Sequence, residues 1–371
     1  MKVLELFGGI GACTQALKRI GMDVEVADYV EIDKYACASY NAINGTNFEP
    51  QDICEWDKNI EVDLIMHGSP CQDFSVAGKQ AGGDVGSGTR SSLMYETIRI
   101  VGKLRPKYVV RENVKNLLSD KHRHNFDAYL ETMKALGYTN YYQVLNAKDY
   151  GIPQNRERVF TISILGDGEF EFPLKQELKI RLKDVLEEVV EEKFYLKDSQ
   201  VLKIKNSNFV QEAKRIQEKD VCDTLLARDW KDPKCVQVGT LDIKGMDCVK
   251  RVYSDEGLSP TLTDMQGGNR QPKIITAAAM RGRYNESGTE QRIETSDREY
   301  ANAITTVQKD SLVSDNIRIR KLTPKECWRL MGFGDEDFEK AAKVNSNTQL
   351  YKQAGNSIVV NVLEAIFKNL F

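Results

Sequence analysis

One cysteine of this chain stands where a nucleophile could act. A mainly apolar run from Val62 to His67 is typical of a buried strand, and Pro70, Cys71 and Gln72 follow it after two small residues. A thiolate attacks carbon well when a loop holds it near its target and its surroundings favour the ionised form. Because an isolated cysteine is more often a small buried hydrophobic residue, the interpretation of Cys71 as a nucleophile depends on the rest of the chain.

A carboxylate and two arginines follow later apolar runs. The run that begins at Tyr108 ends in Glu112, and the carboxyl ends of parallel strands meet at one edge of a sheet. Arg156 and Arg158 enter another strand-like run two residues apart and therefore share one face, which suits a carbonyl or phosphate oxygen. A glutamate at a strand end is usually only solvated. Together with Cys71, however, these residues predict a nucleophile and an acid that act on one substrate.

A glycine-rich turn lies near the N-terminus. Phe7-Gly8-Gly9-Ile10-Gly11 follows an apolar run, and such turns let backbone N–H groups approach a ligand. Thr14 stands in place of the third glycine of the dinucleotide fingerprint, which disfavours NAD. Glu31, twenty residues past Gly11, can accept hydrogen bonds from ribose hydroxyls, and Asp52-Ile53 is expected to follow a third strand end. The pattern predicts an adenosine-containing ligand.

The elements that must position these residues alternate from residue 1 to about 165. This alternation predicts an α/β fold with a doubly wound, mostly parallel sheet. Strands are expected at Val3–Leu6, Val24–Ala27, Leu64–His67, Tyr108–Arg111, Tyr141–Asn146 and Arg158–Leu165. Helices are expected near 12–20, 33–42, 91–104 and 125–136, the last stopped by Gly137.

The composition changes after Pro173. Charged helical residues give way at about 193 to short strands rich in Gly, Asn and Thr, which predict a smaller β-rich lobe of three similar hairpins. A helical pattern returns from about Arg318 and is expected to rejoin the first domain. The predicted boundaries are therefore 1–177, 178–318 and 319–371.

Bulk composition excludes several classes of protein. Hydrophobic residues make up 41% of the chain, yet no apolar run approaches the roughly 20 residues of a membrane span. The chain starts at once with a strand-like run, so we expect no leader peptide and a cytoplasmic protein. Its eight cysteines include no C-x-x-C pair, which disfavours a metal site. A net charge of −3 means that any nucleic acid must be bound by a local basic surface.

Six motifs, in one order along the chain, resemble those of the DNA (cytosine-5) methyltransferases of bacteria and phages. They are Phe7-x-Gly9-x-Gly11, Pro70-Cys71-Gln72, Glu112-Asn113-Val114, Gln154-x-Arg156-x-Arg158, Arg320-Lys321-Leu322-Thr323-Pro324-x-Glu326-Cys327 and Gln353-x-Gly355-Asn356-Ser357. The resemblance covers about residues 1–165 and 318–371. It implies the Rossmann-like fold of S-adenosyl-L-methionine-dependent methyltransferases, with the β-rich lobe as a target-recognition domain.

The resemblance also implies a chemistry. Cys71 attacks C6 of a cytosine that has been flipped out of the DNA stack, and C5 then takes the methyl group of S-adenosylmethionine. Glu112 bonds the N3 and exocyclic-amine edge of the base, Arg158 binds its O2 atom, and Arg156 lies close to the nucleophile.

Family motifs assign cofactor contacts in the same way. Phe7 stacks on adenine, Glu31 binds the ribose hydroxyls and Ile32, where relatives often carry a large aromatic residue, packs against adenine. The expected cofactor-binding set is Phe7, Gly9, Gly11, Glu31, Ile32, Asp52, Ile53, Pro70, Leu93, Asn356 and Ile358.

The resemblance implies double-stranded DNA as the partner, and we expect the enzyme to act on it as a monomer. A cognate endonuclease of a restriction-modification system would be a separate protein. The Gly- and Ser-rich stretch 75–92 is expected to close over the DNA. The family carries a Thr-Leu pair in this lobe, and three Thr-containing units, at 224–225, 261–262 and 305–306, are candidates for it. The distance in sequence to the C-terminal motifs favours Thr305. The expected DNA contacts are Gln72, Ser75, Arg228, Arg270, Arg281 and Thr305.

Two other functions remain as alternatives. One is a tRNA cytosine-5 methyltransferase of the same fold, which the sizeable recognition lobe and the lack of a Cys-Phe-Thr signature disfavour. The other is a non-catalytic DNA-binding homologue. Since Cys71, Glu112, Arg156 and Arg158 are all present, the sequence favours an active enzyme.

Overall fold

The computed structural model describes residues 1–70, 93–195, 237–240, 251–254, 273–276, 278–285, 288–295 and 318–371, with the backbone alone for 237–319 and for Lys321. The chain divides into two compact units. The first contains Met1–Ile180 and Pro324–Phe371, and the second begins at Arg181 and ends at Thr323. The domain limits 1–177, 178–318 and 319–371 stay a prediction.

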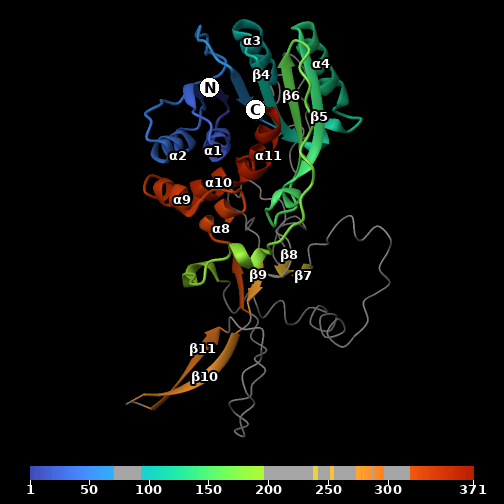
Figure 1. Cartoon of the computed structure of the whole chain (residues 1–371). Coiled ribbons are helices and arrows are strands. Elements are labelled where there is room, and N and C mark those ends of the chain that lie inside the picture. Colours follow the sequence, from blue (N-terminus) through green and yellow to red (C-terminus); the bar gives the residue numbers. More distant parts are fainter. Residues whose placement is uncertain are drawn as a thin grey trace, which may run out of the picture. The chain divides into compact units, whose positions relative to one another are not determined.

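Six strands form the central sheet of the first unit, in the order β2-β1-β3-β4-β6-β5 (Figure 1). Three neighbouring pairs are parallel, whereas β6 runs antiparallel to both β4 and β5. The predicted α/β class is confirmed, with one reversed strand near an edge. The strands are β1 (Lys2–Leu6), β2 (Glu25–Val30), β3 (Leu64–His67), β4 (Tyr108–Val114), β5 (Tyr138–Asn146) and β6 (Glu157–Leu165).

Eight α-helices of the described residues belong to this unit. They are α1 (Ala12–Arg19), α2 (Lys34–Asn44), α3 (Met94–Leu104), α4 (Arg123–Ala135), α8 (Pro324–Arg329), α9 (Asp335–Ala342), α10 (Asn347–Asn356) and α11 (Val360–Leu370). Short 3-10 turns at Lys115–Leu118 and Ala147–Tyr150 follow β4 and β5.

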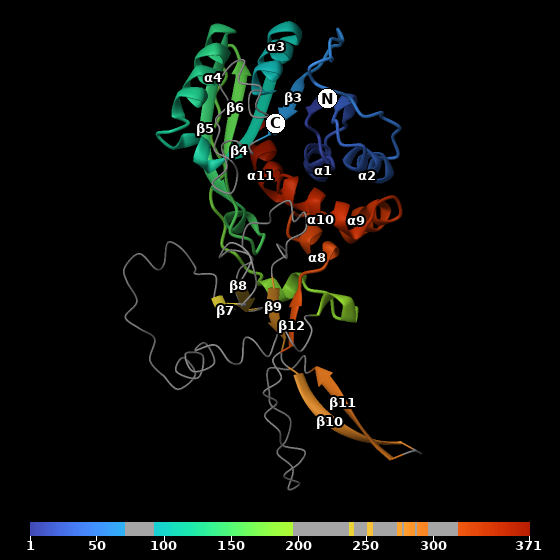
Figure 2. The same cartoon turned by 180° about the vertical axis from the view of Figure 1, so that it is seen from behind.

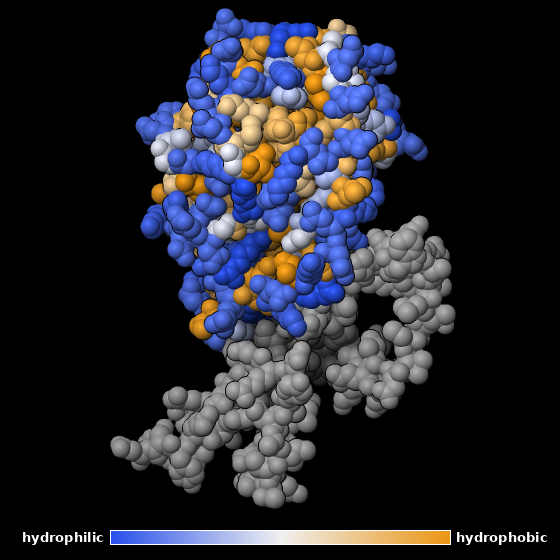
Figure 3. All heavy atoms as spheres, in the orientation of Figure 1, coloured by the Kyte–Doolittle hydropathy of each residue, from blue (hydrophilic) through white to orange (hydrophobic). Residues whose placement is uncertain are grey.

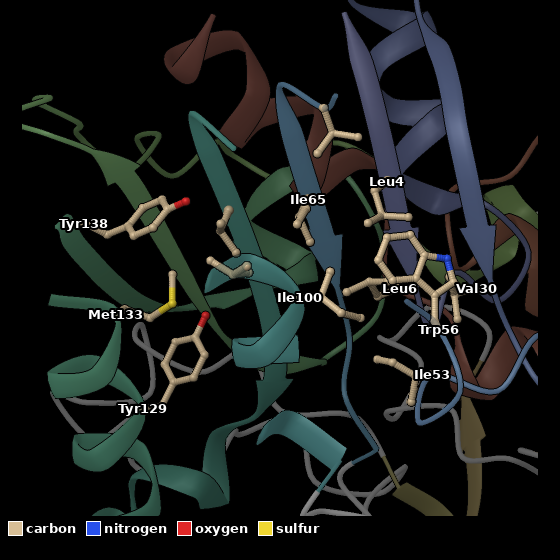
Figure 4. Packing of buried hydrophobic residues seen from close by; sticks show 13 residues of the cluster. Leu4, Leu6, Val30, Ile53, Trp56, Ile65, Ile100, Tyr129, Met133 and Tyr138 are labelled. Atoms are coloured by element: carbon tan, nitrogen blue, oxygen red, sulfur yellow. The ribbon is translucent and has the colours of Figure 1, made fainter. Parts of the chain in front are cut away.

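One face of the sheet packs against α3 and α4. Alternate residues of a strand share a face, so Leu4 and Leu6 point the same way. They join a buried cluster with Ile65, with Ile100 of α3 and with Met133 of α4 (Figure 4). Burial of each such side chain contributes about 1.5–3 kcal/mol, so this layer is a main source of stability.

The other face is covered by α1 and α11, which contact each other. Glu5, on the opposite side of β1 from Leu4, accepts a hydrogen bond from Thr14 of α1. The ring of Phe371, directly after α11, lies 5.1 Å from that of Tyr108. Helices on both faces make the sheet doubly wound (Figure 2).

The predicted strand end before Asp52 is wrong, because residues 45–63 contain no strand. Side chains hold this segment instead. Trp56 Nε1 and Lys58 Nζ each donate to Asp28 Oδ2 at 2.7 Å, and Gln51 Nε2 donates to Asp28 Oδ1 at 3.0 Å. The apolar Ile53 that suggested a strand is buried in the sheet cluster through a turn.

The C-terminal segment completes the first unit through bonds from side chains to backbone carbonyls. Gln154 Nε2 donates to the Leu330 carbonyl at 2.7 Å, and Arg19 donates to that of Gly332. Gln353 Nε2 donates to the Tyr35 carbonyl at 2.9 Å. These contacts join the C-terminal segment to other elements of the first unit.

In the second unit, the described residues are mainly strands. β7 (Gln237–Thr240), β8 (Arg251–Ser254), β9 (Lys273–Thr276) and β12 (Arg318–Lys321) form a sheet in the order β12-β9-β8-β7, and β10 (Ala278–Asn285) pairs with β11 (Gly288–Thr295) as an antiparallel hairpin. The repeat units at 224–225, 261–262 and 305–306 lie outside the described residues.

The surface of the first unit mixes residue types. On the face in Figure 3, hydrophilic residues surround smaller hydrophobic areas. Within the described ranges, every helix is too short or too polar to cross a membrane.

Candidate active site

Strands β4 and β6 bring a carboxylate and an arginine together. Val114 of β4 pairs with Arg158 of β6, and Arg158 Nε lies 3.0 Å from Glu112 Oε1. Both side chains are largely buried. They line a small pocket whose described lining residues are Glu112, Leu145, Arg156, Arg158, Phe160, Ile358, Val359 and Val362. The structure therefore unites Glu112, Arg156 and Arg158, as the sequence predicts.

Arg156 faces the C-terminal segment. Its side chain is 4% exposed, and Nη2 donates to the carbonyls of Gly355 at 3.1 Å and Ser357 at 2.8 Å. A guanidinium presents several donors in one plane, which suits two neighbouring carbonyl oxygens. The bonds fix the residues that continue into the pocket wall at Ile358.

Strand β3 leads directly to this pocket. A Cβ atom placed on Gly68 would lie 3.5 Å from Ile358 Cδ1 and 3.7 Å from Glu112 Oε2, so the backbone passes close to both. Asn113 Nδ2 donates to the Ser69 carbonyl at 3.2 Å, which ties the residues before Pro70 to β4. Cys71 follows in sequence but lies outside the described residues.

The turn after β1 is held by its neighbours. Phe7, Gly9 and Gly11 all have positive φ angles, of 54°, 55° and 84°. A Cβ at Gly11 would lie 2.8 Å from the Tyr40 ring, so both the conformation and the packing require glycine there. A Cβ placed on Gly9 would meet only the Phe7 carbonyl, at 4.0 Å, within the described structure, so the space on that side of Gly9 is open.

Glu31 is fixed next to this turn. Its Oε2 accepts from the Gly9 N–H at 3.1 Å, and its Oε1 accepts from the Asp33 N–H at 2.9 Å. Burial raises the pKa of the Glu31 carboxyl, and these backbone donors offset part of that effect. The Gln51 N–H donates to the Glu31 carbonyl at 2.9 Å, which brings the segment of Asp52 alongside.

The other expected cofactor residues are distributed around these groups. Phe7 and Leu93 pack against the cluster that contains buried Ile53, whereas Ile32 is 68% exposed. Asn356 is exposed at the end of α10, and Ile358 lines the pocket of Glu112. An apolar cluster beside a fixed carboxylate and an open glycine turn is chemically suited to an adenosine group.

Thr14 has a partner that the sequence reasoning missed. It donates to Glu5, which is buried in β1 and also accepts from Tyr40 Oη at 3.3 Å. Burial raises the pKa of Glu5 to about 7, although both hydroxyls act in the opposite direction. The sequence signal that could have revealed this contact is Glu5 itself, a charged residue within an otherwise apolar strand run.

A second buried group also escaped the sequence reasoning. Arg111, 1% exposed, lies with its guanidinium 4.2 Å from the ring centre of Tyr129, and its Nε and Nη1 have no hydrogen-bond partner among the described residues. His67 is its neighbour across β3 and β4. Burial, and then the charge of Arg111, hold the pKa of His67 well below its usual range.

The expected DNA contacts are not described by the structure. Gln72, Ser75, Arg228, Arg270 and Thr305 lie outside the described residues, and Arg281 is on β10, of which the backbone alone is described. In the described ranges, no group of three or more His, Cys, Asp or Glu residues could hold a metal ion.

Comparisons with known proteins agree with this geometry. The family model for C-5 cytosine-specific DNA methylases matches residues 1–371. The orphan methyltransferase M.SPBetaI of Bacillus phage SPbeta is 35% identical over 444 residues, covering 100% of this chain and 97% of that protein. The type II methyltransferase M.HhaI of Haemophilus parahaemolyticus is 32% identical over 375 residues, covering 100% and 94%.

Among solved structures, the Entamoeba histolytica methyltransferase EhMeth matches with a TM-score of 0.65 over 100% of this chain and 98% of that one. At 16% identity, this match concerns the fold alone.

Proposed function

Because the chain belongs to the C-5 cytosine-specific DNA methylase family, and is thus a DNA (cytosine-5) methyltransferase, we propose that the pocket of Glu112 and Arg158 receives the target cytosine. The observation that carries this proposal is the convergence of β3, β4 and β6. The 3.0 Å contact between Arg158 and Glu112 lies beside Gly68, three residues before Cys71.

Each polar group has a task in the proposed reaction. C5 of cytosine is a poor nucleophile, so the Cys71 thiolate adds to C6, and the electrons of the C5=C6 bond become available at C5. Glu112 bonds the N3 and amine edge and Arg158 bonds O2, which stabilises the charge that attack places on the ring. After methylation, loss of the C5 proton and departure of Cys71 restore the double bond.

The apolar wall of the pocket suits the ring of a base. Phe160, Ile358, Val359 and Val362 line it beside the charged groups. A cytosine stacked in a duplex cannot reach such a pocket, so the base must rotate out of the helix before it reacts.

S-adenosyl-L-methionine supplies an electrophilic methyl group when it is bound. We propose that Glu31 accepts hydrogen bonds from its ribose hydroxyls, and the orientation of both carboxylate oxygens by backbone donors supports this role. Phe7, Ile53 and the exposed Ile32 offer apolar contacts for adenine. The other proposed contacts are Gly9, Gly11, Asp52, Pro70, Leu93, Asn356 and Ile358.

We assign DNA recognition to the lobe at about 178–318, with a monomer acting on double-stranded DNA in the cytoplasm. Polar residues of this lobe, among them Arg228, Arg270 and Arg281, are proposed to bond base edges, and Thr305 is proposed to support base flipping. Any cognate endonuclease would be a separate protein.

Bisulfite sequencing of plasmid DNA tests this function. We expect cells that express the protein to show protected cytosines in one short sequence context, and cells that express Cys71→Ala to show none. If folded protein that binds S-adenosylhomocysteine left every plasmid cytosine unprotected, a DNA substrate would be wrong and an RNA substrate would have to be examined.

A further inference from the structure

Arg156 connects the base pocket to the end of a helix. Arg156 lines the pocket, and its Nη2 donates to the carbonyls of Gly355 and Ser357. Gly355 lies in the last turn of α10, where backbone carbonyls lack partners within the helix. A cation is favourable at this end of a helix. Arg156 therefore fixes the C-terminal end of α10 from the side of the pocket.

The segment after α10 lines the pocket of Glu112 and directly follows a residue that we propose contacts the cofactor. Ile358 and Val359 line the pocket of Glu112. Asn356, which family resemblance assigns to the cofactor, is the last residue of α10 and lies between the two carbonyls that Arg156 holds. A shift of this short segment therefore affects both sites.

The body of α10 is bonded to the residues beside Glu31. Lys352 Nζ lies 2.6 Å from Asp33 Oδ2, and Gln353 Nε2 donates to the Tyr35 carbonyl at 2.9 Å. The Asp33 N–H donates to Glu31 Oε1 at 2.9 Å. A continuous series of polar contacts thus runs from Arg156, along α10, through Lys352 and Asp33, to the carboxylate proposed to bind ribose.

We propose that Arg156 is a positioning residue that couples occupancy of the base pocket to occupancy of the cofactor pocket through α10. The inference rests on the proposed function of the two pockets. Coupling of this kind is reciprocal, so the cofactor strengthens DNA binding by the same factor as DNA strengthens cofactor binding. Arg156 acts by holding Gly355 and Ser357.

The test measures the affinity of the full chain for S-adenosylhomocysteine by calorimetry, with and without a duplex that contains the word found by bisulfite sequencing. We expect the duplex to tighten binding to the wild-type protein by about fivefold or more, within the usual range for coupled sites. Arg156→Met is expected to bring this ratio close to one, and Arg156→Lys, which keeps a donor, to restore part of it.

Arg19→Met is the matched control. Arg19 also donates to a carbonyl of the C-terminal segment, at Gly332, but it is not among the residues that line the pocket. A purely structural role of Arg156 would lower the melting temperature of both variants and leave the coupling ratio unchanged in both. Of these two variants, only Arg156→Met is expected to change the ratio.

Lys352→Met provides an independent variant, since it breaks the contact with Asp33 on the far side of α10. If Arg156→Met does not fold, Lys352→Met still tests the coupling. It is also expected to reduce the ratio of the two affinities. A wild-type ratio of one, or a ratio unchanged in the folded variants, would overturn the coupling while leaving methylation intact. Failure of the wild-type protein to bind S-adenosylhomocysteine at all would instead contradict the proposed cofactor site.

Discussion

Arg158 Nε lies 3.0 Å from Glu112 Oε1, across the antiparallel pair β4 and β6. This contact engages one carboxylate oxygen, and the other, Oε2, is directed toward the backbone of Gly68 at the end of β3. The arginine thereby orients the glutamate toward the strand that precedes Cys71. Orientation of an acid by a neighbouring cation is what a pocket needs if one edge of a base is to be bonded in a fixed direction.

Replacement of Glu112 by Gln should slow methyl transfer strongly. The amide cannot exchange a proton with N3, and a positioned acid or base typically contributes 10²–10⁴-fold, so we expect a loss of about that size. Single-turnover incorporation of a labelled methyl group measures the rate. Affinity for S-adenosylhomocysteine should be nearly unchanged, and a clear weakening would contradict the place assigned to Glu112.

Glu157→Gln is the control for this variant. Glu157 adjoins Arg158, but its carboxylate is exposed and pairs with Lys115 at 3.0 Å. Surface pairs of this kind contribute about 0–1 kcal/mol, so its removal should leave the rate within a factor of two or so.

Glu5 should make stability depend on pH. Its pKa is about 7 in the folded protein against 4.5 for the ordinary group, so the folded state retains a proton that the unfolded state has lost. Stability therefore falls as pH rises from 4.5 to 7, by on the order of 3 kcal/mol in total. Glu5→Gln removes this term while keeping an acceptor for Thr14.

Melting temperatures between pH 5 and pH 8 test this expectation. The wild-type curve should fall more steeply than that of Glu5→Gln, and the variant should be the more stable protein at pH 8. Glu61→Gln, which changes an exposed carboxylate, should follow the wild-type curve. Parallel curves for wild type and Glu5→Gln would show that the buried carboxyl has no such effect.

Arg111→Met should stabilise the protein. A buried cation without an acidic partner in the described structure has a desolvation cost that aromatic contacts with Tyr129 offset only in part. Replacement of buried ionic groups by apolar residues of similar volume is often neutral or stabilising by about 1–4 kcal/mol, so we expect a higher melting temperature.

Arg158→Met is the informative comparison, because it removes one partner of a largely buried pair and leaves Glu112 without its cation. It should lower the melting temperature. If both arginine variants moved the melting temperature downward by similar amounts, the distinction between an unpaired and a paired buried guanidinium would be wrong.

Gly8→Ala should weaken the binding of S-adenosylhomocysteine. The new Cβ would lie 2.6 Å from the ring of Tyr29, whose hydroxyl donates to the Gly9 carbonyl at 2.6 Å, so ring and turn must move apart. Overpacking of this kind typically costs about 1–3 kcal/mol. Gly102→Ala is the control, since a Cβ there meets Leu136 at an ordinary 3.7 Å within α3. Unchanged affinity in Gly8→Ala would contradict the role of the turn.

Patterns along the chain predicted the active-site strands well and the supporting contacts poorly. Leu64–His67 was predicted with its observed limits, because four consecutive buried residues leave a clear apolar run. Glu112 was expected at the edge where strands end, whereas only the family resemblance placed Arg158 beside it. The two meet because β6 runs antiparallel to β4, so that the start of β6 lies beside the end of β4.

The features that the sequence did not predict have one physical origin. Each depends on a partner that is distant in sequence. Asp52 follows no strand because Asp28, on another element, anchors that segment. The donation from Thr14 to Glu5 and the burial of Arg111 under Tyr129 require tertiary packing that spacing alone does not encode. The direction of the Arg156 hydrogen-bond donors depends on Gly355, which lies almost two hundred residues later in the chain.

The discontinuity of the first unit has an evolutionary consequence. Ile180 and Pro324 both belong to it, and most of the chain between them belongs to the second unit, so this chain is in effect a long insertion into the first unit. The entropy of closing a loop rises only with the logarithm of its length, and each doubling costs about 0.6 kcal/mol. A lobe of different length between these two points therefore changes the loop-closure entropy of the first unit only slightly. If this lobe reads DNA as proposed, its exchange would alter the sequence that is read and leave the proposed base pocket in place.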